Sequence, residues 1–200
     1  MNEDPAALLA TYPEPGARAL KKQLGSLDPH CLRFIALSPF VVLATGNRAG
    51  QMDASPRGGV AGFVKAADER TLLIPDASGN NRLDSLRNII DSAHIGLLFM
   101  VPGVEETLRV NGAARLSRSP SQLQHFADEK KPPRLVIEVT VHEAYLHCAK
   151  AFMRSRLWEA DKQVLRSALP SMGQMISDQT GSDAPAESQA QMRARYAADL

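Results

Sequence analysis

Apolar and polar residues alternate from residue 135 to residue 145, and this period of two is typical of a β-strand with one buried face. Its apolar face would carry Ile137, Val139 and Val141. Helices do not alternate regularly with strand-like segments, which argues against a doubly wound α/β fold. The sequence therefore predicts a mainly β protein, a six-stranded antiparallel barrel, closed or nearly closed, with helices around it. Five further strand-like segments, bounded by turn residues, lie at 40–45, 51–55, 71–74, 94–101 and 107–116.

The predicted strands occupy the middle of the chain, and helical patterns lie on both sides of them. We expect a helical extension over residues 1–39, a barrel domain over 40–158, and a C-terminal helix with a polar tail over 159–200. Residues 177–191 are small, polar and acidic and are expected to form a mobile tail. The sequence predicts one helix over 15–24 and a second that Asp28 caps and that Ser38-Pro39 ends. A third helix, over 81–90, would carry Leu83, Leu86, Ile89 and Ile90 on one face. Further helices are predicted over 120–127, from 149 through Trp158 to Leu169, and over 190–198.

Composition excludes several classes of protein. The 200 residues carry a formal net charge of +1, so the chain lacks the excess of Lys and Arg that neutralises nucleic-acid phosphates. Its histidines and cysteines show no metal-ligand spacing, and no metal is expected. Cys31 and Cys148 leave a disulfide open, although reduced thiols are expected because nothing suggests secretion. We recognise no signal peptide, and the longest apolar stretch, residues 95–102, is too short to span a bilayer, so we expect a cytoplasmic protein.

Two segments each place an arginine where an anion could bind. In the first, Ser55 and Arg57 precede two glycines, which allow close backbone approach, and a guanidinium matches a phosphate. In the second, residues 74–84, a strand ends, a polar loop follows and a helix begins. We expect Arg82 in the first turn of that helix, where backbone N–H groups attract anions. Each segment also fits a simpler interpretation, a tight turn with a solvated Arg57 or a capped surface helix.

A third segment, residues 147–158, combines three cations with the only Trp of the chain. Lys150, Arg154 and Trp158 recur every four residues, so a helix would bring them to one face. Such a face could pair with a phosphate and stack on an aromatic ring. The alternative is a solvated basic face with a packed Trp.

Thr107, Arg109 and Asn111 share one face of a predicted strand. That face is either exposed to solvent or forms a polar wall beside a ligand. The sequence contains no GxSxG, P-loop or GxGxxG pattern, so it offers no signal for a serine hydrolase or for those nucleotide-binding sites.

Four segments in this order resemble the pyridoxamine 5′-phosphate oxidase-like family of FMN-binding split-barrel proteins. They are SPRGG, IPD with GNNR and SLRNI, ETLRVNG, and HCAKAFMRSRLW, and the resemblance covers about residues 40–158. It implies a six-stranded split barrel and a homodimer with two FMN molecules at the subunit interface.

The resemblance also implies which residues bind the cofactor. Asn81 and Arg82 stand where pyridoxamine phosphate oxidases have Arg and Lys, and their Arg-x-His signature is missing after Trp158. These departures argue against pyridoxamine phosphate as the substrate. By this resemblance, Ser55 and Arg57 would contact the flavin and its phosphate, and Asn81 and Arg82 would bind the phosphate. The backbone of Ile74 and Pro75 would approach the isoalloxazine edge, Thr107 would contact the ring, and Trp158 would come from the partner subunit. Lys150 and Arg154 of the basic segment complete the set of candidate residues.

The resemblance suggests an FMN-dependent oxidoreductase that acts on a small molecule which the sequence does not identify. No side chain is an obvious acid or base near the flavin, so the catalytic residues are unassigned. The alternatives are a non-catalytic flavin-binding protein, or a split barrel that uses a deazaflavin or haem. In the haem case, His142 or His147 could supply an axial ligand.

Overall fold

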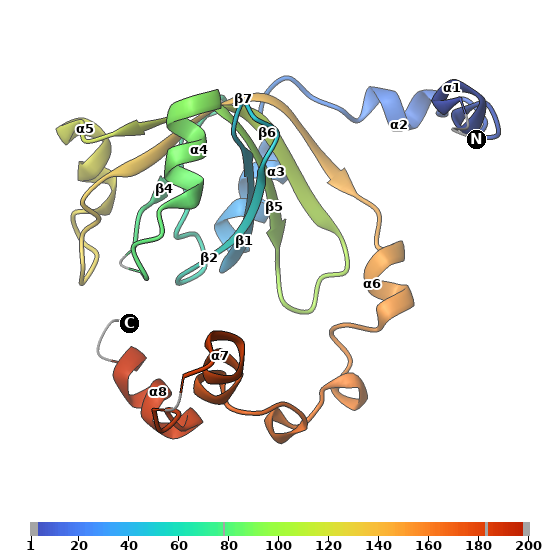
Figure 1. Ribbon diagram of the computed structural model, residues 1–200. Helices are drawn as coiled ribbons and strands as arrows, with labels where there is room; N and C mark the ends of the chain where they lie inside the picture. Colours follow the sequence, from blue (N-terminus) through green and yellow to red (C-terminus); the bar gives the residue numbers. More distant parts are fainter. Residues whose placement is uncertain (1–3, 78, 183, 198–200) are drawn as a thin grey trace. The chain divides into compact units, whose positions relative to one another are not determined.

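A computed structural model describes residues 4–77, 79–182 and 184–197 (Figure 1). The chain divides into two compact units, Met1–Arg154 and Ser155–Leu200. The first unit contains one antiparallel sheet of seven strands, so the predicted count of six was wrong. Its hydrogen-bonded order is β2-β1-β5-β6-β7-β4-β3, with β2 and β3 as open edges rather than a closed barrel. The strands are β1 (Phe40–Gly46), β2 (Met52–Gly58), β3 (Lys65–Asp68), β4 (Thr71–Pro75), β5 (His94–Met100), β6 (Thr107–Ser117) and β7 (Val136–His147).

The unpredicted strand is β3, an edge strand of four residues with the sequence KAAD. It pairs with β4 across a tight turn in which the Arg70 N–H donates to the Asp68 carboxylate at 2.7 Å. Three of its four side chains are exposed, so it shows no apolar alternation that could reveal it. Local hydrogen bonding with β4 forms this strand, and the sequence pattern did not predict it.

The alternation predicted for the last strand is confirmed in β7 from Ile137 onward, although Val136, predicted on the exposed face, is also buried. Ile137, Val139 and Val141 are buried, whereas Thr140 and His142 are exposed. The register with β6 then shifts, because Asn111 pairs with Glu143 while Gly112 pairs with Val141. This β-bulge turns both His142 and Glu143 outward and returns Ala144 to the core.

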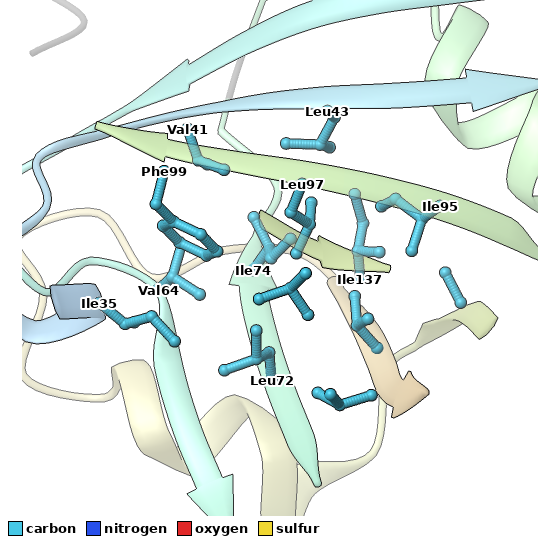
Figure 2. Packing of buried hydrophobic residues seen from close by; sticks show 14 of the residues in the cluster. Ile35, Val41, Leu43, Val64, Leu72, Ile74, Ile95, Leu97, Phe99 and Ile137 are labelled. Carbon is cyan, nitrogen blue, oxygen red and sulfur yellow. The ribbon is translucent and has the colours of Figure 1, made fainter. Parts of the chain in front are cut away.

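The larger cluster of buried hydrophobic residues lies on one face of the sheet (Figure 2). Val41, Leu97 and Phe99 from the central strands meet Ile74 of β4 and Ile35 of a helix, and all are at most 2% exposed. Each fully buried side chain of this size contributes about 1.5–3 kcal/mol to folding. This continuous cluster holds the strands that carry the candidate site.

Two helices, α3 (Pro29–Leu37) and α4 (Asp84–Ser92), pack against this core, and α2 (Ala17–Lys21) precedes them in the chain. α2 falls within the predicted first helix. α3 is capped as expected, with the Asp28 carboxylate accepting the Cys31 N–H at 2.8 Å. α4 buries Leu86 and Ile89, but Ile90 is 74% exposed, so the predicted apolar face was too wide. The other helices of this unit are α1 (Pro5–Leu9), α5 (Pro120–Leu123), the 3₁₀ helix η1 (Gln124–Phe126) and most of α6 (Lys150–Ser155).

The second unit is built from short helices. The long helix predicted through Leu169 is wrong, because α6 ends at Ser155 and Arg156 adopts a left-handed conformation with φ 52°. The expected tail, residues 177–191, is partly helical, because it contains the end of α7 (Met172–Thr180) and the start of α8 (Gln189–Ala197). Residue 198, which the terminal-helix prediction included, lies outside the described residues. Two 3₁₀ helices, η2 (Ala160–Lys162) and η3 (Arg166–Ala168), precede α7.

Two further expectations concern the cysteines and the membrane. Cys31 is buried, Cys148 is exposed, and both are free thiols. Among residues 4–77, 79–182 and 184–197, no helix has the length and apolar character needed to cross a bilayer.

Candidate functional site

The edge strand β2 presents three polar residues on one face. Asp53, Ser55 and Arg57 are half-buried, while the alternate residues, Ala54 and Pro56 among them, are exposed. Arg57 uses one terminal nitrogen twice: Nη1 donates to the Ser55 hydroxyl and, at 2.9 Å, to the Pro56 carbonyl. These bonds fix the guanidinium and leave its Nε and Nη2 edge available for another acceptor.

The loop before α4 differs from the prediction at Arg82. Asn81 and Leu83 have positive φ values of 59° and 60°, so the helix begins only at Asp84 and Arg82 lies in the loop rather than in the first turn. The Arg82 N–H donates to the Asn80 side-chain oxygen at 3.1 Å, which stabilises this turn. Leu83 occupies the N-cap position and makes no side-chain hydrogen bond to the helix. The first N–H groups of α4 therefore receive no cap from that residue.

Asp53 connects β2 to the start of α4. Its carboxylate accepts a 2.6 Å hydrogen bond from the Ser85 hydroxyl. The ion pair with Asp84, and more weakly the charge of Asp53, raise the pKa of Arg82. Ser55 and Arg57 point to the same side of β2 as Asp53. The structure thus brings the two arginine-bearing segments to one edge of the sheet.

Arg82 is held only loosely by its present partner. Its Nε donates to the Asp84 carboxylate at 2.8 Å, but the two side chains are 75% and 39% exposed. Exposed ion pairs of this kind contribute little and are screened by salt. A phosphate could therefore displace Asp84 from the guanidinium without disturbing the fold.

The donor set fits a phosphate monoester. Arg57 offers a fixed two-nitrogen edge, Arg82 a weakly held guanidinium, Ser55 a hydroxyl, and α4 an N-terminus of a nine-residue helix. Asp76, directly after β4, lies within electrostatic reach of Arg57. Burial raises its pKa, and the Arg57 charge opposes that rise. The donors for an anion on β2 thus lie within electrostatic reach of a carboxyl group whose pKa is raised by burial.

The structure places the remaining predicted residues differently. Ile74 is 0% exposed within the core, so only its backbone can approach a ligand, while Pro75 is half-buried at the end of β4. Thr107 begins β6 next to Leu108, which is in register with Phe99 of β5. Since Leu108 faces the core, Thr107 faces the opposite side of the sheet from Arg57.

The basic segment does not form the predicted three-residue face. Lys150 and Arg154 lie one turn apart on α6 of the first unit. Trp158 follows the left-handed Arg156, belongs to the second unit, and is not part of that helix. The four-residue recurrence is thus interrupted before it reaches the Trp.

Sequence reasoning missed Asp53, Asp76 and Ser85. Asp53 and Asp76 lie within the two segments singled out for their arginines, but nothing in the pattern showed that a β2 carboxylate would bind α4. Among the described residues no cluster of His, Cys, Asp and Glu could hold a metal ion. An open groove of about 850 Å³ lies elsewhere, and its lining contains none of the residues predicted to bind the flavin, although it includes Asn111 of the predicted polar strand face and His142, the candidate haem ligand.

Comparisons with known proteins agree with this architecture. The family profile described as pyridoxamine 5′-phosphate oxidase matches residues 27–148, more than half of the chain, and the chain therefore belongs to that family. Two crystal structures of HupZ from Group A Streptococcus, one of them a variant with a single substituted histidine, are 15% identical with TM-scores of 0.50 and 0.51. Each match covers 60% of this chain and at least 93% of HupZ.

A candidate pyridoxamine 5′-phosphate oxidase from Lactobacillus delbrueckii is 19% identical with a TM-score of 0.49, covering 62% of this chain and 98% of its own. A comparison with curated proteins gives no match. At these identities the structural neighbours support the fold. The family resemblance inferred from the four sequence segments is confirmed.

Proposed function

We propose that this protein binds FMN, with the phosphate held at the β2 edge by Arg57, Arg82, Ser55 and the start of α4. The observation that carries the proposal is that Asp53 of β2 binds the start of α4 and lies within electrostatic reach of Arg82, with Ser55 and Arg57 on the same face of that strand. Family membership supports a flavin, and the donor set fits its phosphate. Bound FMN would supply hydride or electron transfer, and the protein would orient it and exclude water, as expected for an FMN-dependent oxidoreductase.

We further propose that the protein acts as a homodimer with FMN between the subunits. Thr107 lies three strand positions from β2, about 14 Å away, and on the opposite face of the sheet. One flavin contacts both residue sets most simply if the phosphate residues come from one subunit and Thr107 of the partner subunit meets the ring. The outer face of β1 and β2 supports this arrangement, because Phe40 and Met52 are 37% and 74% exposed there.

The direct test is cofactor binding by the purified protein. We expect a yellow protein, or one that takes up FMN with quenching of its fluorescence, and whose flavin is reduced by dithionite or a nicotinamide donor. Sedimentation should show a dimer. A colourless protein that takes up no FMN would contradict the proposal, and a Soret band that is lost in His147→Ala would favour haem instead.

A further inference from the structure

A group of basic residues surrounds one tyrosine on the outer face of β6 and β7, away from the arginine edge. Tyr145 of β7 is in register with Arg109 of β6, whose Nη1 donates to the Tyr145 hydroxyl at 2.8 Å. The Lys22 ammonium and the Arg109 guanidinium each lie 5.5 Å from the centre of the tyrosine ring. His147 completes the group, its ring 5.7 Å from that of Tyr145.

This group has more positive charge than its surroundings neutralise. Within the part of the chain that the structure describes, no carboxylate lies within ion-pair distance of Arg109, Lys22 or His147. The nearest acid on the same strand is Glu143, which already accepts hydrogen bonds from Gln23 and Asn111. Two permanent cations, the half-buried Arg109 and the exposed Lys22, therefore lie beside Tyr145 with no carboxylate in ion-pair contact, while Glu143 keeps its charge and is hydrogen-bonded to neutral amides.

The free hydrogen-bonding capacity of the group consists largely of donors. Arg109 uses one of its five N–H groups on Tyr145, and Lys22 uses one on the Leu146 carbonyl at 2.9 Å. Because the Tyr145 hydroxyl accepts from Arg109, its own proton remains to be donated. Such a set matches a carboxylate or a phosphate, both of which only accept when ionised.

The imidazole of His147 responds to the same charges. Burial lowers its pKa, and Arg109 on β6 and Lys22 after α2 lower it further, while Glu143 lies further along its own strand. A bound anion would offset the two cations and raise the pKa of His147 again. The histidine thus reports whether an anion is present.

We propose that Arg109, Lys22, Tyr145 and His147 form an anion-binding subsite for the carboxylate or phosphate group of the substrate. Thr107 is in register with His147 and lies two residues before Arg109 on the same face. This assignment rests on the proposed function, since a flavin ring at Thr107 would have the subsite beside it. The enzyme would then act on small anionic molecules.

The experiment titrates inorganic phosphate and acetate into the FMN-loaded protein and follows the His147 ring by NMR, assigned with His147→Gln. We expect saturable shifts and a rise in the His147 pKa. Arg109→Gln and Lys22→Gln should each weaken the phosphate Kd about tenfold or more. Their controls, Arg118→Gln and Lys21→Gln, remove exposed charges close by in the sequence and should stay within about twofold.

The dissociation constant for FMN separates this proposal from the previous one. Arg109→Gln and Lys22→Gln should bind FMN within about threefold of the parent protein, because the flavin phosphate belongs at Arg57. A large loss of FMN affinity would show that the group holds the cofactor phosphate and would overturn the proposal. A His147 signal that does not respond to either anion, or equal losses in variants and controls, would overturn it as well. If the protein binds no FMN at all, the same titration of the cofactor-free chain still decides the anion subsite.

Discussion

Arg57→Gln is the substitution that most sharply tests how the phosphate would be bound. Both Nη1 hydrogens of Arg57 are occupied by Ser55 and Pro56, so three N–H groups remain, two of which lie on the Nε and Nη2 edge and can bind two phosphate oxygens. A charge-assisted hydrogen bond contributes about 1.5–3 kcal/mol. Its loss should weaken the FMN Kd by roughly tenfold to 150-fold. Arg57→Lys keeps the charge but not the planar edge, and we expect an intermediate loss.

A substitution at Ser55 provides a second test of the same binding site. If its hydroxyl acts by fixing the guanidinium, Ser55→Ala should cost about 0.5–1.5 kcal/mol of FMN binding, and this cost should largely disappear when Arg57 is already Gln. The assay is quenching of FMN fluorescence at constant ionic strength. Arg48→Gln, an exposed arginine after β1, serves as the control and should change the Kd by less than about twofold. Arg57→Gln that binds FMN as tightly as the parent would refute the assignment.

Three other substitutions test separate parts of the account. Asp84→Asn removes the exposed partner of Arg82 and should tighten FMN binding by up to about fivefold in the same titration; weaker binding would count against a phosphate role for Arg82. Burial raises the pKa of Asp76 in the folded state above the ordinary value of 3.8, so ionisation of this carboxyl group destabilises the fold as the pH rises from 3.8 through the folded-state pKa. Asp76→Asn should therefore raise the Tm near pH 7 and leave it unchanged near pH 3. Gly112→Ala would place a Cβ 2.0 Å from a β7 carbonyl oxygen and should cost about 2–3 kcal/mol in denaturant unfolding, whereas Gly25→Ala, with open space around it, should be close to neutral.

The sequence predicted the strands whose side chains alternate strongly, because burial of one face imposes that pattern. β7 and the central strands belong to this group. β3 was missed because its exposed side chains carry no such pattern and only its hydrogen bonds to β4 define it. The bulge at Gly112 was also invisible, since it depends on how two strands pair rather than on either one alone.

Residues of the candidate site were predicted better than their geometry. The loop with Arg82 was identified, but the left-handed Leu83 delays the start of α4, and a leucine in that conformation cannot be foreseen from propensity. Arg156 ended α6 early for the same reason, which removed Trp158 from the predicted helix face. Asp53 and its bond to Ser85 are long-range contacts that only the packed structure shows.

The central claim is that the β2 edge and the start of α4 recognise the phosphate of a flavin mononucleotide. The most direct measurement compares the dissociation constants for FMN and for riboflavin, which has the same ring but no phosphate. We expect the parent protein to prefer FMN by about 100-fold or more, and a variant with Arg57→Gln and Arg82→Gln to lose most of that preference. Equal affinity for the two flavins in the parent protein, or an unchanged preference in the double variant, would contradict the account.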